Sequence, residues 1–132
     1  MYTRILTVGM FLGHFRPVPN IIKQILSGNG GGEVVEVEDG FAALKRLSET
    51  PFDGVLFAWD MEPMTAQRFL CELPPQIRPF PLIAAVVRPE EGAKAIASGA
   101  TTWIGRPASA HSLVQKMPAL LAPIPEAYQH AA

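Results

Sequence analysis

Hydrophobic positions along the chain follow two patterns, short apolar runs typical of buried strands and longer segments with helical periodicity. The apolar runs predict strands over residues 4–9, 33–38, 52–59, 82–87 and 101–104. Helical spacing predicts helices over 20–26, 41–48, 65–73, 89–99 and 109–117. Strands that alternate with helices in this way are typical of a parallel sheet covered on both faces, with right-handed crossovers.

Some details of this pattern give sharper predictions. The apolar alternation at the end of 33–38 indicates a strand at a sheet edge, and the uninterrupted apolar run 82–87 indicates a central strand. In the helix over 41–48 we expect Phe41, Leu44 and Leu47 to face the core. Residues 10–19 contain a glycine and two prolines, which predicts a long loop without a helix.

Composition and charge narrow the class of protein. The 132 residues are 48% hydrophobic and 17% charged, which indicates one globular domain. The net charge of −1 predicts no nucleic-acid partner and no anionic membrane surface. The single cysteine, Cys71, excludes an internal disulfide, and no apolar run approaches the roughly 20 residues that span a bilayer. With no secretion signal at its start, the chain is predicted to be cytoplasmic.

Several local signatures follow one another in an order that resembles the receiver domain of bacterial two-component response regulators. They are the segments 34–44, 52–57 and 59–64, followed by Gly99-Ala100, Trp103 and Arg106-Pro107. The resemblance implies a flavodoxin-like, doubly wound α/β fold: a five-stranded parallel sheet of order 2-1-3-4-5 with five helices. This single domain would occupy residues 1–122, followed by a tail over 123–132.

Receivers of this family transfer a phosphoryl group to an aspartate with the help of Mg²⁺, and the resemblance shows where those residues would stand. The metal-holding acidic pair falls on Gly9 and Met10, and the phosphoacceptor falls on Ala58. The family's hydroxyl falls on Val86, and its lysine falls on Arg106, which keeps the charge without the compact ammonium. Because a hard cation needs oxygen ligands, we expect no Mg²⁺ at this site. With no nucleophile at Ala58 we also expect no enzymatic activity, and we expect no other metal and no cofactor.

Four residues are candidates for a switch or an interface. In the family, an aromatic side chain at the position of Trp103 swings between two rotamers on activation. Trp103 could therefore be a hot spot for a protein partner on the face built by the fourth helix, fifth strand and fifth helix. The alternative is a partly buried core aromatic, and we slightly favour the interface. The other candidates are Trp59, which lies beside the vacant site, Lys94 and His111.

The loop that follows the first strand is longer than the family usually has. Its residues Phe11, His14, Phe15 and Arg16 could fold as a lid over an apolar, vacant site, or they could offer apolar surface to a partner. We favour the lid, because Met10, Ala58 and Val86 would make that site apolar.

The sequence therefore predicts a pseudo-receiver that acts as a protein-interaction module without phosphorylation. Its partner would be a histidine kinase, another regulator or a second copy of the chain. One alternative is a small-molecule or anion sensor that uses the vacant crevice with Arg106 as anchor. Another is a receiver phosphorylated at Asp60, although a solvated loop carboxylate is the favoured interpretation of that residue.

Overall fold

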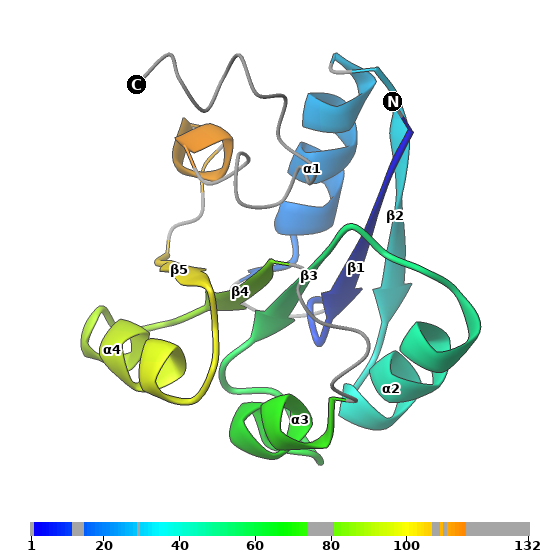
Figure 1. Ribbon diagram of the computed structural model, residues 1–132. Coiled ribbons are helices and arrows are strands. Elements are labelled where there is room, and N and C mark those ends of the chain that lie inside the picture. The colour runs from blue at the N-terminus through cyan, green and yellow to red at the C-terminus, as the bar shows by residue number, and fades with distance from the viewer. Residues whose placement is uncertain are drawn as a thin grey trace, which may run out of the picture.

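The structure of the protein, a computed structural model, describes residues 2–11, 15–28, 30–73, 81–106, 109 and 111–115. Its elements follow the predicted alternation (Figure 1). In chain order they are β1 (Thr3–Val8), α1 (Val18–Ser27), β2 (Gly32–Val37), α2 (Gly40–Glu49), β3 (Gly54–Ala58), α3 (Ala66–Glu72), β4 (Leu82–Ala85), α4 (Glu90–Ala97) and β5 (Thr102–Ile104). A further helical segment covers residues 111–115.

The five strands form one parallel sheet in the order β2-β1-β3-β4-β5. Figure 1 shows α1 and the segment 111–115 on one face of the sheet, with α2, α3 and α4 on the other. The predicted flavodoxin-like fold is confirmed, and so are the edge position of β2 and the inner position of β4. In such an open sheet the carboxyl ends of the strands share one edge, which is the usual place for a site.

Helices α2 and α3 begin where a side chain caps the first turn, whereas α1 and α4 have no such side-chain cap. The Asp39 carboxylate accepts a hydrogen bond from the N–H of Ala42 at the start of α2, at 2.9 Å. The Thr65 hydroxyl accepts one from the N–H of Arg68 at the start of α3, at 3.1 Å. The prediction that 10–19 lacks helix is wrong at its end, because α1 already begins at Val18. Proline is tolerated in a first turn, where its missing N–H would have no partner.

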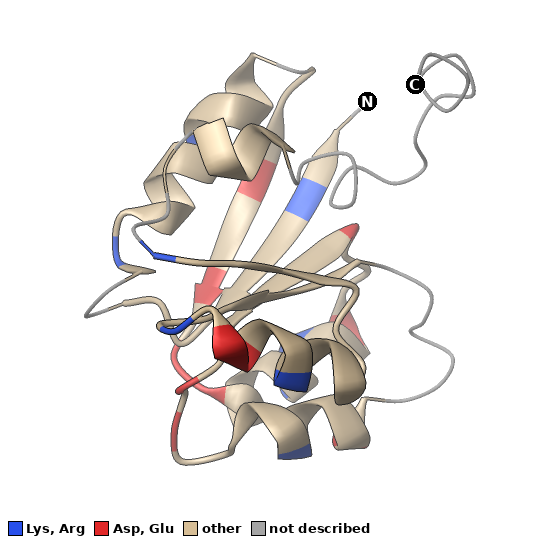
Figure 2. Cartoon of the chain, turned by 90° about the vertical axis from the view of Figure 1, so that its left-hand side faces the viewer, with Lys and Arg blue, Asp and Glu red and all other residues tan. Residues whose placement is uncertain are grey.

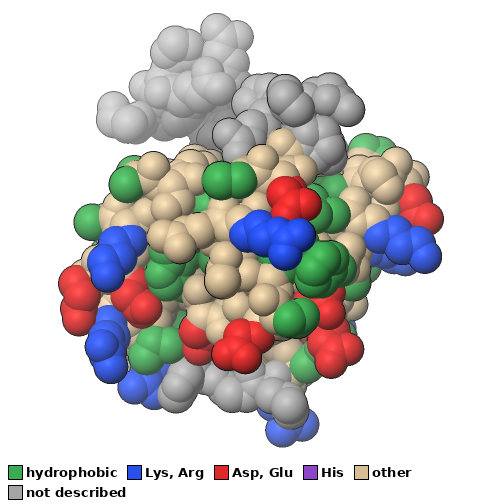
Figure 3. Space-filling view, turned by 90° about the horizontal axis from the view of Figure 1, so that it is seen from below, with side chains coloured by type: hydrophobic (Ala, Val, Ile, Leu, Met, Phe, Trp, Pro, Cys, Tyr) green, Lys and Arg blue, Asp and Glu red, His purple; other side chains and the backbone are tan. Residues whose placement is uncertain are grey.

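The core lies between the sheet and its two helical layers. Strands β3 and β4 are buried along their length, and the Phe57 ring packs against Phe69 of α3 with centroids 5.8 Å apart. The prediction that Phe41 faces the core is wrong: its side chain is 49% exposed, and the Arg68 guanidinium lies 5.4 Å from its ring centroid. Figure 3, which views the molecule from below, shows apolar side chains interspersed with charged ones on this side.

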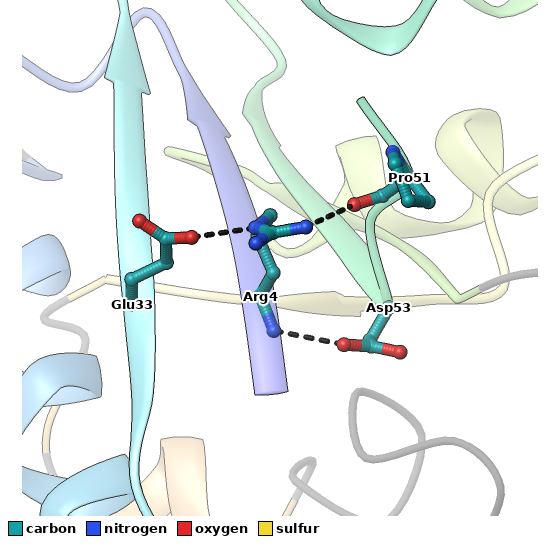
Figure 4. Close-up of polar contacts among 4 residues, drawn as sticks. All are labelled: Arg4, Glu33, Pro51 and Asp53. Carbon is teal, nitrogen blue, oxygen red and sulfur yellow. Dashed lines mark hydrogen bonds and ion pairs between the residues drawn. The ribbon is translucent and has the colours of Figure 1, made fainter. Parts of the chain in front are cut away.

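A polar cluster joins three strands near their amino ends (Figure 4). The Arg4 guanidinium on β1 pairs with Glu33 on β2 and donates to the carbonyl of Pro51 at 3.3 Å. The hydrogen bond to Glu33 raises the pKa of Arg4 above its ordinary value. The Asp53 carboxylate accepts from the backbone N–H of Arg4 at 2.8 Å, while its own N–H donates to the Arg4 carbonyl at 2.8 Å. Asp53 thus continues the pairing of β1 and β3 before β3 begins.

Charged residues of both signs are distributed over helices, strands and loops (Figure 2). This distribution agrees with the net charge of −1. Among the residues that the structure describes, no helix has the length and apolar character needed to cross a membrane.

Candidate functional site

The predicted site positions lie at the carboxyl edge of the sheet. Gly9 and Met10 follow β1, Ala58 is the last residue of β3, and Val86 follows β4 directly. The strand register pairs Val8 with Phe57 and Ala58 with Ala85, so these positions fall at the same level of the sheet. The structure therefore places Gly9, Met10, Ala58 and Val86 at one edge, whereas Arg106 lies two residues after β5 and is exposed.

This edge is closed and apolar. Met10 is 2% exposed, Ala58 is 1% exposed and Val86 has no exposed surface. None of the three side chains carries an oxygen or nitrogen atom that could bind a cation or attack a phosphorus atom. The edge is consequently part of the hydrophobic core.

Met61 occupies space beside Gly9 and Ala58. Gly9 has a φ of +73°, and a Cβ added there would lie 3.0 Å from the Cβ of Met61 and 3.6 Å from that of Ala58. The N–H of Met61 donates to the Ala58 carbonyl at 3.1 Å, which closes a turn and brings residue 61 back to the strand end. Sequence reasoning did not single out Met61, although an apolar residue between Asp60 and Glu62 was a signal for burial.

Met64 fills a second position in the same loop. Its side chain is 1% exposed, and a Cβ added to Gly40, the first residue of α2, would lie 2.7 Å from its sulfur. Between the two methionines the Glu62–Pro63 peptide bond is cis. The loop 59–64 thus turns Met61 and Met64 inward, while Asp60 and Glu62 are exposed. Methionine suits this role because its flexible thioether fills irregular spaces.

The residues at this edge do not fit a Mg²⁺ ion at the position that the family uses. Mg²⁺ requires oxygen ligands in near-octahedral geometry, and Gly9, Met10 and Ala58 provide no side-chain oxygen. Carboxylates do occur in the loops after β2 and β3, at Glu38 and Asp60, but both side chains are exposed. Within the described ranges, no group of three or more His, Cys, Asp or Glu residues is placed to hold a metal ion.

Trp103 lies on β5 and packs against α4. Its side chain is half-buried and contacts the core. A Cβ added to Gly92 of α4 would lie 2.3 Å from Cε2 of the indole and 2.5 Å from Nε1. The indole therefore lies across the backbone of α4 at a point where only glycine leaves room, which combines core packing with a partly exposed surface.

The predicted interface residues Lys94 and His111 lie on the helical segments before and after β5 in the chain. Lys94 on α4 and His111 in the segment 111–115 are exposed, and so is Arg106 after β5. Two apolar side chains on these elements are also exposed, Ile96 at 45% and Val114 at 52%. Figure 1 shows α4, β5 and the segment 111–115 along the same side of the molecule.

Comparison with known proteins rests on structure. No protein-family model matches the chain, and no curated protein matches it. Solved structures do match. A putative response regulator from Chloroflexus aurantiacus J-10-fl is 17% identical, with a TM-score of 0.76 over 92% of this chain and 99% of that one. The chemotaxis protein CheY4 of Vibrio cholerae is 22% identical, with a TM-score of 0.73 over 92% of this chain and 100% of that one. The fold is that of response regulator receiver domains.

A third similar structure is the receiver domain of the Francisella response regulator 1452. It is 20% identical, with a TM-score of 0.69 over 89% of this chain and 95% of that one. This likeness to the receiver fold agrees with the signatures in the sequence and with the strand order that they implied. It gives the fold a second basis, which does not depend on any single motif.

The loop after β1 in this receiver fold is described in part. Phe15 is 3% exposed and belongs to the core, whereas Phe11 is 44% exposed and Arg16 is exposed. His14 lies outside the described residues. A lid built from this loop stays a prediction.

Trp59, directly after β3, is half-buried against the core, and its backbone N–H donates to the Ala85 carbonyl at 2.8 Å.

Proposed function

We propose that the chain is a receiver-like domain that takes no phosphoryl group and serves bacterial signal transduction as a protein-interaction module. The observation that carries the proposal is the closed apolar edge around Ala58. Phosphoryl transfer needs a nucleophile, and its metal ion needs carboxylate ligands. Gly9, Met10 and Ala58 supply neither, and Met61 occupies the adjacent space. We propose that the domain has no enzymatic activity.

The surface that we assign to the partner lies on α4, on β5 and on the segment 111–115. We call it the α4–β5 face and define it by Lys94, Ile96, Trp103, His111 and Val114. Two exposed aliphatic side chains and a half-buried indole offer apolar area, and Lys94 adds a positive charge. Tryptophan and aliphatic anchors with a polar rim are typical of protein interfaces. A histidine kinase, another regulator or a second copy of the chain would fit such a surface.

The sensor alternative has less support. It requires an open, ligand-sized space beside Ala58, with Arg106 as anchor for an anion. Ala58 is 1% exposed and Met10 is 2% exposed, and Met61 lies beside Gly9 and Ala58. Opening the crevice would require these apolar contacts to be broken.

Treatment with Mg²⁺ and a small phosphodonor tests the loss of phosphorylation. We expect no phosphoryl adduct by intact mass spectrometry, because Ala58 has no nucleophile and the metal ligands are missing. A receiver domain that keeps the acidic pair and the acceptor, treated in parallel, shows that the donor is competent. An adduct that disappears in Asp60→Asn would overturn the proposal in favour of phosphorylation at Asp60.

Substitution on the α4–β5 face tests the interaction role. We expect Ile96→Glu to weaken binding to a cognate kinase or regulator, or self-association, by at least about tenfold, because a charge would replace exposed apolar area. Phe41→Glu is the matched control, since Phe41 is similarly exposed at 49% but lies on α2. Binding can be measured by calorimetry and self-association by sedimentation. Equal losses for both variants would contradict the assigned face.

A further inference from the structure

In the loop between β4 and α4, two backbone N–H groups bind the side-chain carboxylate of Glu91. The backbone N–H groups of Val87 and Arg88 both donate to the same oxygen, Oε1 of Glu91, at 3.1 and 2.9 Å. Consecutive amides that converge on one acceptor form a concave arrangement that binds anions. In this protein the acceptor is a carboxylate of the chain itself, and its charge strengthens both hydrogen bonds.

Glu91 also determines how α4 begins. The residue before the helix, Pro89, provides no side-chain cap, and the first turn contains Glu90 and Glu91. The carboxylate of Glu91 reaches back to an N–H three residues earlier, as the acidic residue of a capping box does. A negative charge in the first turn is also favoured by the helix dipole. The start of α4 is thus tied to the end of β4 through one side chain.

The same side chain is linked to Trp103 through its neighbour. Gly92 follows Glu91, and its Cα faces the indole of Trp103 so closely that a Cβ would lie 2.3 Å from Cε2. On the other side of the loop, the N–H of Val86 donates to the Ile104 carbonyl of β5 at 2.9 Å. The exit of β4, the first turn of α4 and the indole on β5 therefore form one connected unit.

We propose that Glu91 is a positioning residue whose carboxylate acts as a built-in anion, fixing the β4–α4 loop so that Gly92 stays against Trp103. The α4–β5 face then keeps one arrangement without a phosphoryl group or any other external anion. This inference rests on the proposed function, because it explains how an interaction face is held ready when phosphorylation is lost. It assigns to Glu91 a role that ordinary capping alone would not include.

Quenching of Trp103 fluorescence by acrylamide tests this role on the isolated chain. In a Trp59→Phe background Trp103 is the single tryptophan. We expect Glu91→Ala to raise its quenching constant about twofold, because local opening of the loop would expose the indole. Glu91→Gln keeps an acceptor oxygen without the charge, so we expect its quenching constant to lie between those of the Glu91 protein and Glu91→Ala.

The matched control is Asp39→Ala, which removes the side-chain cap of α2 at a similar hydrogen-bond length of 2.9 Å. Circular dichroism at the same temperature shows that each variant is folded. If Glu91→Ala raises quenching no more than Asp39→Ala does, Glu91 is only a helix cap and the inference is overturned. The measurement needs neither partner nor phosphodonor, so it can fail or succeed independently of the proposed function.

Discussion

Replacement of Ala58 by aspartate, the residue type of a phosphoacceptor, is expected to destabilise the domain by about 3 kcal/mol at neutral pH, because a buried charge without a partner is strongly unfavourable. Ala58 is 1% exposed, its neighbour Met61 is apolar, and both belong to the hydrophobic core. We also expect Ala58→Asp to accept no phosphoryl group, since Gly9 and Met10 provide no ligand for Mg²⁺. One aspartate alone would not supply the chemistry.

The destabilisation of Ala58→Asp should depend on pH with a defined sign. Desolvation raises the pKa of a buried carboxyl in the folded state above its unfolded value. The loss is therefore largest above the folded pKa and shrinks as the pH falls toward the unfolded value of about 3.9. Urea unfolding at neutral and mildly acidic pH measures it.

Ala58→Asn separates charge from size. The amide has the shape of the aspartate without its charge, so we expect a smaller loss of stability and no pH dependence in the same range. If Ala58→Asp proves as stable as Ala58→Asn at neutral pH, the space around residue 58 is solvated or holds a cationic partner. That result would contradict the closed apolar edge.

Gly92→Ala is expected to destabilise the domain by about 2 kcal/mol, because the added methyl overlaps the Trp103 indole and overpacking forces neighbours to shift. The added carbon would lie 2.3 Å from Cε2, well inside van der Waals contact. Alanine is a better helix former than glycine by about 1 kcal/mol, so a net loss would show that the steric term outweighs propensity. Chemical unfolding of both proteins gives the difference.

Two controls locate the cause of that loss. At Gly28, which has a φ of −85°, an added Cβ would meet its nearest neighbour at 3.7 Å, so Gly28→Ala should be neutral or slightly stabilising. In a Trp103→Leu background, Gly92→Ala should lose most of its effect. An unchanged effect in that background would mean that the overlap with the indole is not responsible.

Much of the fold could be predicted because its elements are strongly patterned. The apolar runs of β1, β3 and β4 and the caps at Asp39 and Thr65 are local signals, and the structure confirms them. Two errors have physical causes. Pro19 looked like a breaker but occupies the first turn of α1, where no N–H is needed. Phe41 matched the apolar stripe of α2 but is exposed, and the Arg68 guanidinium lies over its ring.

The sequence could predict which side chains the site lacks, but it could not predict which side chains occupy the space. The absence of carboxylates at Gly9 and Ala58 can be read from the sequence once the resemblance to receiver domains assigns these positions to the site. The place of Met61 depends on a turn that returns to the Ala58 carbonyl, and helical or strand periodicity does not describe such a turn. The convergence of two amides on Glu91 likewise depends on loop geometry.

The conformation of Gly9 limits which residues this position can accept. At a φ of +73°, with Met61 3.0 Å from the missing Cβ, an aspartate at this position would be strained and crowded before it could bind a metal. An aspartate at position 58 would be buried without a counter-charge. A single substitution that introduces an aspartate at either position is therefore expected to give a less stable protein. Evolutionary change at these two positions is thus expected to be restricted by stability before metal binding comes into play.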